Sequence, residues 1–198
     1  MNRIARRLVF PAVILLLFAA FDKPRHTAPV PDARQAKIAF ELLNKIRQNP
    51  SAYYDLGFNA GFPVTQTPLV WNDTLARVAE KKAMDMATHR YFSHTDLQGY
   101  GMNYYINAAG YKLNVDWLKN KRMNNFESIQ AGAAGGEDAV KRLITDAGVP
   151  SLGHRKHLLG SGNFYNQLSD IGIGFVWADS ADKYNCYVSV IIAMHNWK

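Results

Sequence analysis

Two histidines and two acidic residues, spread over sixty positions, are the side chains best suited to do chemistry in this chain of 198 residues. His154 stands in Gly153-His154-Arg155, just before the apolar pair Leu158-Leu159. A histidine entering an apolar turn needs partners for both ring nitrogens, and these must come from elsewhere in the chain. His94, Glu127 and Asp146 precede it. We expect the fold to bring these four residues together as a cleft tetrad.

Two imidazoles and two carboxylates suit zinc or another divalent cation, with water completing the coordination shell. His94 and His154 are then the candidate metal ligands, with Glu127 and Asp146 as second partners. The same set could activate water, with a carboxylate as the base. The positions are far apart in the sequence, and no local motif such as H-E-x-x-H supports a metal. A hydrogen-bonded polar cluster without a metal is therefore the alternative.

The spacing of Asp146 from nearby apolar residues predicts which face of a helix it occupies. It follows Ala139 by seven and Leu143 by three, so it shares the apolar face of a helix predicted to begin at Glu137. A buried carboxylate must pair with a donor or a metal, because an unpaired one is costly. A solvated helix end is the competing interpretation. The helix dipole disfavours an acid at this end, which favours a specific partner.

The remaining histidines and the single cysteine have structural interpretations. His157, three residues after His154, could share a metal on a helix, but an exposed or packing role is preferred. His89 and His195 are single histidines near the ends of elements. Cys186 excludes a disulfide framework, and it lies in a strand-like run as a small core residue rather than a catalytic thiol.

The charge and the length of the chain argue against a nucleic-acid-binding protein and for a single domain. The formal charge is +7, and removing the three arginines of residues 1–21 leaves +4, a dispersed excess that does not predict a nucleic-acid partner. The length predicts one domain with a processed end.

The first 21 residues have the layout of a secretory signal peptide. A basic flank precedes the apolar run from Leu8 to Phe21, with Ala19 and Ala20 near its end. A spanning helix needs about 20 apolar residues, so a permanent anchor is disfavoured. Phe18 stands where cleavage wants a small residue, which leaves an uncleaved tether as the alternative. We expect an exported protein that contacts membranes only through an uncleaved leader.

A linker rich in proline follows at 22–31, and the domain occupies 32–198. Asp32 and Gln35 predict the start of a first helix, which stops at Asn49-Pro50. Asn72 or Asp73 caps a second helix that ends near His89, with the charges at 81, 82 and 85 on its solvated side. A short third helix begins near Met102, and residues 114–125 form an exposed excursion.

The last thirty residues switch to strand character. Alternating residues over 171–177 and a β-branched run over 187–193, joined by a polar turn at 179–183, predict an antiparallel hairpin. Gly172 and Gly174 within a strand predict close approach of a neighbouring backbone. Helices followed by a hairpin predict an α+β fold, with helices packed over a small antiparallel sheet.

Four segments together resemble the CAP superfamily of cysteine-rich secretory, venom-antigen and pathogenesis-related proteins, in its cysteine-poor bacterial form. The first is 42–47 in the first helix, and the second is 69–75 together with His94 in Phe92-Ser93-His94. The third is Glu127-Ser128-Ile129, and the fourth is Gly153-His154-Arg155 together with the strand 171–175. The resemblance covers about residues 34–195. Each motif is weak alone, but four in order are specific.

The resemblance implies a three-layer α-β-α sandwich with a cleft that holds two histidines and two acids. His94, Glu127 and His154 match three family positions, and Asp146 stands where the family usually has Glu. Its side chain is shorter by one carbon–carbon bond, about 1.5 Å. Phe126 and Ser128 also depart from the family pattern, as does the excursion 114–125, which is expected to rim the cleft.

The resemblance does not select one ligand. Family members are associated with lipid or sterol binding, cell-surface interaction and proteolysis. We expect an exported binding module whose partner is a small molecule, a lipid or a cell-surface component. A metal-dependent hydrolase acting on peptide or cell-wall polymer is the alternative, and a purely structural surface protein is the third.

Overall fold

The computed structural model describes residues 27–194. The predicted signal peptide of residues 1–21 and His195 lie outside this range. Within it, no helix has the length and apolar character needed to cross a membrane.

The sheet is built around the hairpin that the sequence predicted. Strands β4 (Asp170–Trp177) and β5 (Cys186–Ala193) pair antiparallel over their full length. Strand β3 (Glu127–Ala131) pairs antiparallel with the far side of β5, and β1 (Val30–Pro31) pairs antiparallel with β4. The strand order is β1-β4-β5-β3, and β2 (Val70–Trp71) adds to β4 in parallel. β3 is therefore an edge strand.

Helix starts follow from capping side chains. The Asp32 carboxylate accepts the Gln35 amide at 3.1 Å, and α1 runs from Ala33 to Gln48. The Asn72 side chain accepts the amides of Thr74 and Leu75, and α2 runs from Asp73 to His89. The other helices are α3 (Met102–Ala108), α4 (Gly136–Thr145), α5 (Gly153–Leu159) and the 3₁₀ segments η1 (Pro50–Leu56), η2 (Val115–Leu118) and η3 (Tyr165–Gln167). Both predicted helix starts are confirmed.

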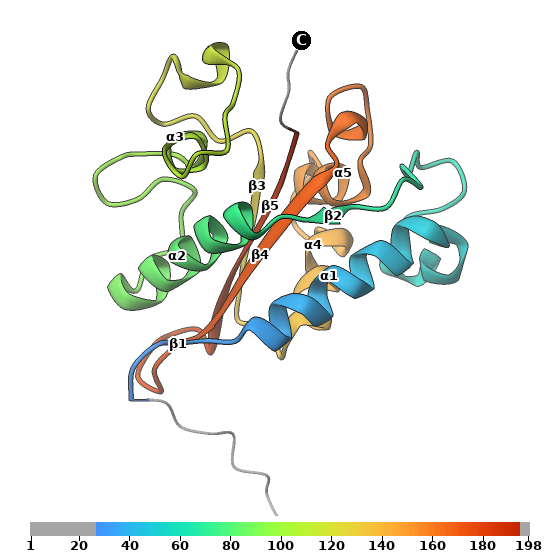
Figure 1. Cartoon of the computed structure of the whole chain (residues 1–198). Helices are drawn as coiled ribbons and strands as arrows, with labels where there is room; N and C mark the ends of the chain where they lie inside the picture. The colour runs from blue at the N-terminus through green and yellow to red at the C-terminus, as the bar shows by residue number, and fades with distance from the viewer. Residues whose placement is uncertain (1–26, 195–198) are drawn as a thin grey trace, which may run out of the picture.

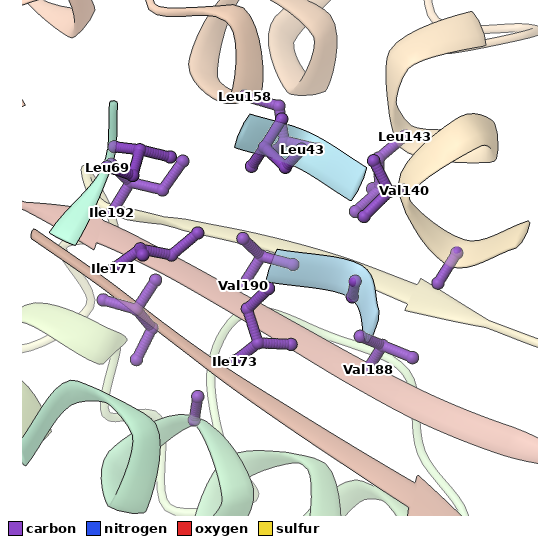
Figure 2. Close-up of a cluster of buried hydrophobic side chains, with 14 of the residues drawn as sticks. Leu43, Leu69, Val140, Leu143, Leu158, Ile171, Ile173, Val188, Val190 and Ile192 are labelled. Atoms are coloured by element: carbon purple, nitrogen blue, oxygen red, sulfur yellow. The ribbon is translucent and has the colours of Figure 1, made fainter. Parts of the chain in front are cut away.

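The helices cover the two faces of the sheet and give the expected three layers. Helix α2 lies along one face of β4 and β5, while α1 and α4 lie on the other, as Figure 1 shows. The core between the sheet and α1, α4 and α5 is aliphatic (Figure 2), and its members include Leu43, Val140, Leu143, Leu158, Ile173, Val188 and Val190. Burial of these side chains is the main force that closes the sandwich.

Two glycines of β4 allow α2 to press its backbone against the sheet. A Cβ atom on Gly172 would lie 2.1 Å from the amide nitrogen of Ala76, and one on Gly174 would lie 2.3 Å from the carbonyl carbon of Ala79. Such distances are far inside van der Waals contact. The predicted close approach of a neighbouring backbone is confirmed.

Three details differ from the sequence-based expectations. Lys82 was expected on the solvated face of its helix, but it is only 5% exposed in the structure. Residues 30–31, expected to be linker, form the edge strand β1, where proline can sit because its missing N–H faces outward. Strand β3 was not predicted, since Glu-Ser-Ile-Gln-Ala is short and its polar residues 127, 128 and 130 do not alternate with apolar ones.

Candidate functional site

The first half of the site stands at the start of edge strand β3. The side chain of Glu127 is fully buried, and its Oε2 lies 3.0 Å from Nδ1 of His94 in the loop that follows α2. The other carboxylate oxygen, Oε1, accepts a hydrogen bond of 2.7 Å from the Ser189 hydroxyl on β5. The acid is thus held from two sides, and the imidazole reaches outward with 41% of its side chain exposed.

The second half joins the end of α4 to the start of α5. Asp146 follows the last residue of α4 in the left-handed conformation, at φ 51°, and its side chain is 1% exposed. Its Oδ1 lies 2.6 Å from Nδ1 of His154, while Oδ2 accepts the backbone amides of His154 at 3.0 Å and Arg155 at 3.2 Å. The expectation of a buried, partnered acid at this position is confirmed.

The two halves share one chemical arrangement. In each, a buried carboxylate accepts from Nδ1 of a histidine, which leaves Nε2 as the unprotonated nitrogen when the ring is neutral. Within residues 27–194, neither Nε2 of His94 nor that of His154 makes a hydrogen bond. Both imidazoles are more exposed than their acids. Each histidine is therefore oriented from behind, with its second nitrogen available.

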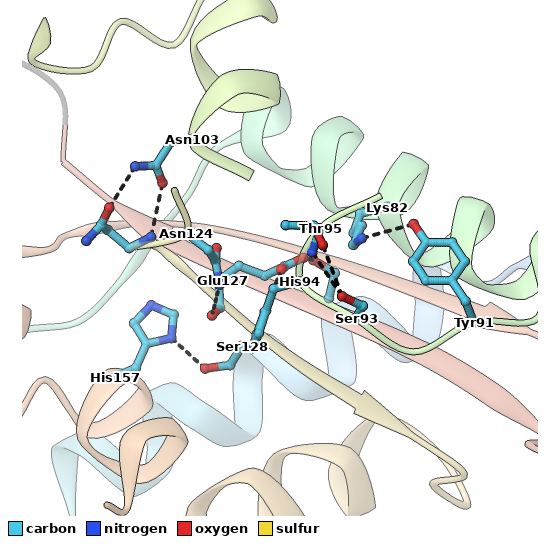
Figure 3. Close-up of polar contacts among 12 residues, drawn as sticks. Lys82, Tyr91, Ser93, His94, Thr95, Asn103, Asn124, Glu127, Ser128 and His157 are labelled. Atoms are coloured by element: carbon cyan, nitrogen blue, oxygen red, sulfur yellow. Dashed lines mark hydrogen bonds and ion pairs between the residues drawn. The ribbon is translucent and has the colours of Figure 1, made fainter. Parts of the chain in front are cut away.

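Strand β3 and helix α5 connect the two halves. Ser128 follows Glu127, and its hydroxyl lies 2.7 Å from Nδ1 of His157, one turn of α5 after His154 (Figure 3). A hollow of about 220 Å³ runs beside β3 and is lined by Ile129, Gln130, Asp146 and His154, with Phe92 and Tyr184 also contributing. Phe92 precedes His94 by two residues.

The four predicted residues are thus arranged as two His–acid pairs. Within the described part of the chain, no group of three or more His, Cys, Asp or Glu side chains is positioned to hold a metal ion.

Ser128 and His157 form a contact that resembles a nucleophile–base pair but is sealed in the interior. Ser128 is 2% exposed and His157 is 3% exposed. Burial lowers the pKa of His157 to about 3 and outweighs the opposing effect of a backbone hydrogen bond with Ile192. The ring therefore stays neutral and packs against Tyr165. Of the two roles expected for His157, exposed or packing, this position fits the packing one.

Lys82 is a buried cation close to the pair formed by Glu127 and His94. Its Nζ donates to the Tyr91 hydroxyl at 3.0 Å (Figure 3), and that hydroxyl donates to Asp85. Burial lowers the Lys82 pKa, while the charges of Glu127, Asp85 and Asp96 oppose this shift. Lys82 therefore adds positive potential beside Glu127. The sequence carried a signal for it, since position 82 shares the helix face of 75, 79 and 86.

The remaining histidine and cysteine candidates lie outside the two pairs. His89 forms a third, surface pair, with Nδ1 2.9 Å from Oδ1 of Asp85 and its side chain 51% exposed. Cys186 is fully buried, and burial raises the pKa of its thiol to about 11, so it is a core residue as predicted.

Comparisons with solved structures show the same fold. Among the similar structures, an extracellular protein with an SCP domain from Bacillus anthracis has a TM-score of 0.52 and 20% identity. That match covers 82% of this chain and 41% of the other, so this chain spans less than half its length. An outer surface protein from Borrelia burgdorferi has a TM-score of 0.50 and 18% identity, with 86% and 98% of the two chains covered.

The sequence comparisons give the family. A search of curated proteins gives no significant match. The sequence profile of the cysteine-rich secretory protein family, CAP, matches residues 40–191, which is most of the chain. Together with the α-β-α sandwich, this match shows that the chain belongs to the CAP family.

Proposed function

We propose that this chain is an exported binding module that holds a divalent cation through the Nε2 atoms of His94 and His154, the second of which lines the hollow beside β3. The observation that carries the proposal is the pairing of each Nδ1 with a buried carboxylate, at 3.0 Å in one pair and 2.6 Å in the other. Metal-binding histidines are commonly held in this way, because an acid bonded to Nδ1 fixes the tautomer and raises the basicity of the ligating Nε2.

The donor set decides what kind of site this would be. Two imidazole nitrogens suit zinc or a related borderline cation rather than calcium or magnesium, which prefer oxygen. Two protein ligands are fewer than the four of a structural zinc site or the three of a catalytic one. A bound cation would therefore keep open positions for water or for an oxygen of a partner molecule. When bound, the cation would act as a bridge to that partner.

The state of the carboxylates favours binding over hydrolysis. A general base must have an acceptor position available to the water that it deprotonates. Both oxygens of Glu127 are engaged, by Ser189 and His94, and both oxygens of Asp146 are engaged by α5. Because the side chains of both acids are also buried, at 0% and 1% exposure, bulk water does not reach their remaining lone pairs, and the arrangement supports orientation of the histidines rather than turnover.

Export is part of the same proposal. One structural neighbour is an extracellular protein and another is an outer surface protein, which supports a similar location for this chain. The basic, apolar and small-residue order of residues 1–21 supports a secretory signal. Mass spectrometry of protein from the exported fraction would show whether the leader is removed.

Zinc titration of the full chain by calorimetry tests the cation site. We expect one equivalent of zinc to bind, with at least tenfold weaker binding in His94→Gln and in His154→Gln. His89→Gln is the matched control, because it removes an exposed His–acid pair outside the hollow. Equal loss in the control, or no loss in the His94 and His154 variants, would refute the site. Zinc-dependent turnover of casein or peptidoglycan that His154→Gln abolishes would show the hydrolase alternative instead.

A further inference from the structure

The surplus positive charge of the described chain is concentrated in one loop. Residues 27–194 contain 17 Lys and Arg and 15 Asp and Glu. Residues 112–122, here called the basic loop, hold four of those bases and one of the acids, so the remainder has 13 bases and 14 acids. Within residues 27–194, the positive excess is therefore local. It lies on Lys112, Lys119, Lys121 and Arg122, all of which are exposed.

The basic loop is firmly attached to the domain. The Trp117 ring packs against Phe126 and Phe164 at centroid distances of 5.7 and 5.3 Å, and its carbonyl accepts from Asn103 Nδ2 at 2.8 Å. The Gly101 amide donates to the Lys121 carbonyl at 2.7 Å, and a Cβ on Gly101 would collide with the backbone of Arg122 and Met123 at the end of the loop. The loop is thus a preorganised projection, drawn in yellow-green beyond α3 in Figure 1.

Apolar and aromatic groups accompany the charges. Val115, at the start of η2, is 74% exposed, which is the highest value among the exposed large hydrophobic residues of the described chain. Lys121 Nζ lies 4.9 Å from the centre of the Tyr100 ring, which in turn contacts Tyr104, itself 46% exposed. An exposed aliphatic side chain and tyrosines beside lysines match the two layers of a lipid surface, apolar chains below and anionic headgroups above.

We propose that the basic loop docks the protein onto the surface of an anionic lipid bilayer, with the lysines and Arg122 meeting the headgroups and Val115 entering the boundary below them. The sequence predicts membrane contact only through an uncleaved leader, whereas this surface lies in the folded domain. Charge complementarity selects the partner, because the loop carries a net charge of +3 on a domain that is otherwise slightly acidic. The proposal does not depend on the cation site.

Vesicle co-sedimentation of the full chain tests it, with phosphatidylcholine vesicles compared with vesicles that also contain phosphatidylglycerol. The triple variant Lys119→Gln, Lys121→Gln, Arg122→Gln should bind the anionic vesicles about a hundredfold more weakly, following about fivefold for each basic residue. The control triple Lys45→Gln, Lys156→Gln, Lys183→Gln removes the same charge from exposed sites elsewhere. Both variants keep the leader, so binding through it cancels in the comparison.

A second variant separates a lipid surface from a soluble polyanion. Val115→Asn keeps every charge and should weaken binding to anionic vesicles severalfold while leaving binding to heparin unchanged. Circular dichroism melts confirm that each variant is folded. Wild-type affinity in the loop triple would overturn the proposal, as would equal loss in the control triple. Tight heparin binding together with no effect of Val115→Asn on vesicle binding would also overturn it, in favour of a soluble anionic polymer.

Discussion

The carboxylate of Asp146 holds His154 by two separate atoms, the imidazole Nδ1 at 2.6 Å and the backbone amide at 3.0 Å. The same carboxylate also accepts the Arg155 amide. Leu152, which precedes α5, offers no capping side chain, so Asp146 caps this helix from six residues further back. One acid thus aligns the histidine ring and satisfies the start of the helix that carries it.

This double role predicts the effect of changing Asp146. Asp146→Ala should lower the free energy of unfolding by about 1–3 kcal/mol, because two buried amides lose their acceptor. Asp146→Asn should cost less, since its carbonyl oxygen still accepts and asparagine tolerates the left-handed backbone at φ 51°. Urea denaturation measures both. Asp116→Ala, at an exposed ion pair, is the control and should change stability by less than about 0.5 kcal/mol.

The hydrogen bonds of the Arg155 guanidinium predict a second effect on stability, which does not involve the His154 imidazole. Its guanidinium donates to the carbonyls of Ile144 and Thr145 at the end of α4 and to those of Leu56 and Gly57 beside η1. Lysine cannot supply this fork of donors, so Arg155→Lys should cost about 2–3 kcal/mol of unfolding free energy. The exposed substitution Arg77→Lys should leave the denaturation midpoint unchanged. Equal midpoints for the two variants would show that the guanidinium contacts contribute little.

Buried His157 predicts a pH dependence of stability. Its pKa is about 3 in the folded protein and 6.5 when unperturbed, so between these values the unfolded chain binds one proton more. The folded state is therefore favoured less as the pH falls from 6.5 towards 3, by up to about 1.4 kcal/mol per pH unit from this residue. His157→Gln can still bond Ser128 but does not titrate. Denaturation at a series of pH values should give this variant a shallower slope than the wild type; identical slopes would contradict the assignment.

The close packing of α2 on the glycines of β4 predicts that an added methyl group there lowers stability. Gly174→Ala should destabilise the protein by about 1–3 kcal/mol or more, because the added methyl meets the backbone of α2 and forces the layers apart. Gly153→Ala is a fair comparison, since the new Cβ would lie 3.6 Å from the Ser151 hydroxyl, at ordinary contact distance. Thermal melts should separate the two variants clearly. A tolerated Gly174→Ala would mean that α2 can shift away from the sheet at little cost.

Much of the fold could be predicted from local sequence patterns. The cap residues Asp32 and Asn72 mark the starts of two helices, and alternation over 171–177 marks the hairpin. Strand β3 could not be predicted in this way, because its polar residues Glu127 and Ser128 bond partners that only the tertiary structure supplies. A short edge strand is defined by the neighbour it pairs with rather than by its own periodicity.

The candidate site, too, could be predicted from the sequence only in part. The two acids and two histidines were identified from residue type and family resemblance, but their arrangement as two pairs depends on distances of 33 and 8 residues along the chain. Ser189, which holds Glu127 from the neighbouring strand, sits in an apolar run and carries no sequence signal. Lys82 looked solvated because lysine usually is, although its helix face predicted burial.

The most direct test of the cation site is imidazole nitrogen NMR during a zinc titration of the full chain. Long-range correlation spectra distinguish Nδ1 from Nε2 in each histidine and report which nitrogen carries the proton. We predict that Nε2 of His94 and of His154 shift together and saturate at one equivalent of zinc, while both Nδ1 atoms stay protonated against their carboxylates. Shifts confined to one of these rings, or to His89, would contradict a shared cation between the two pairs.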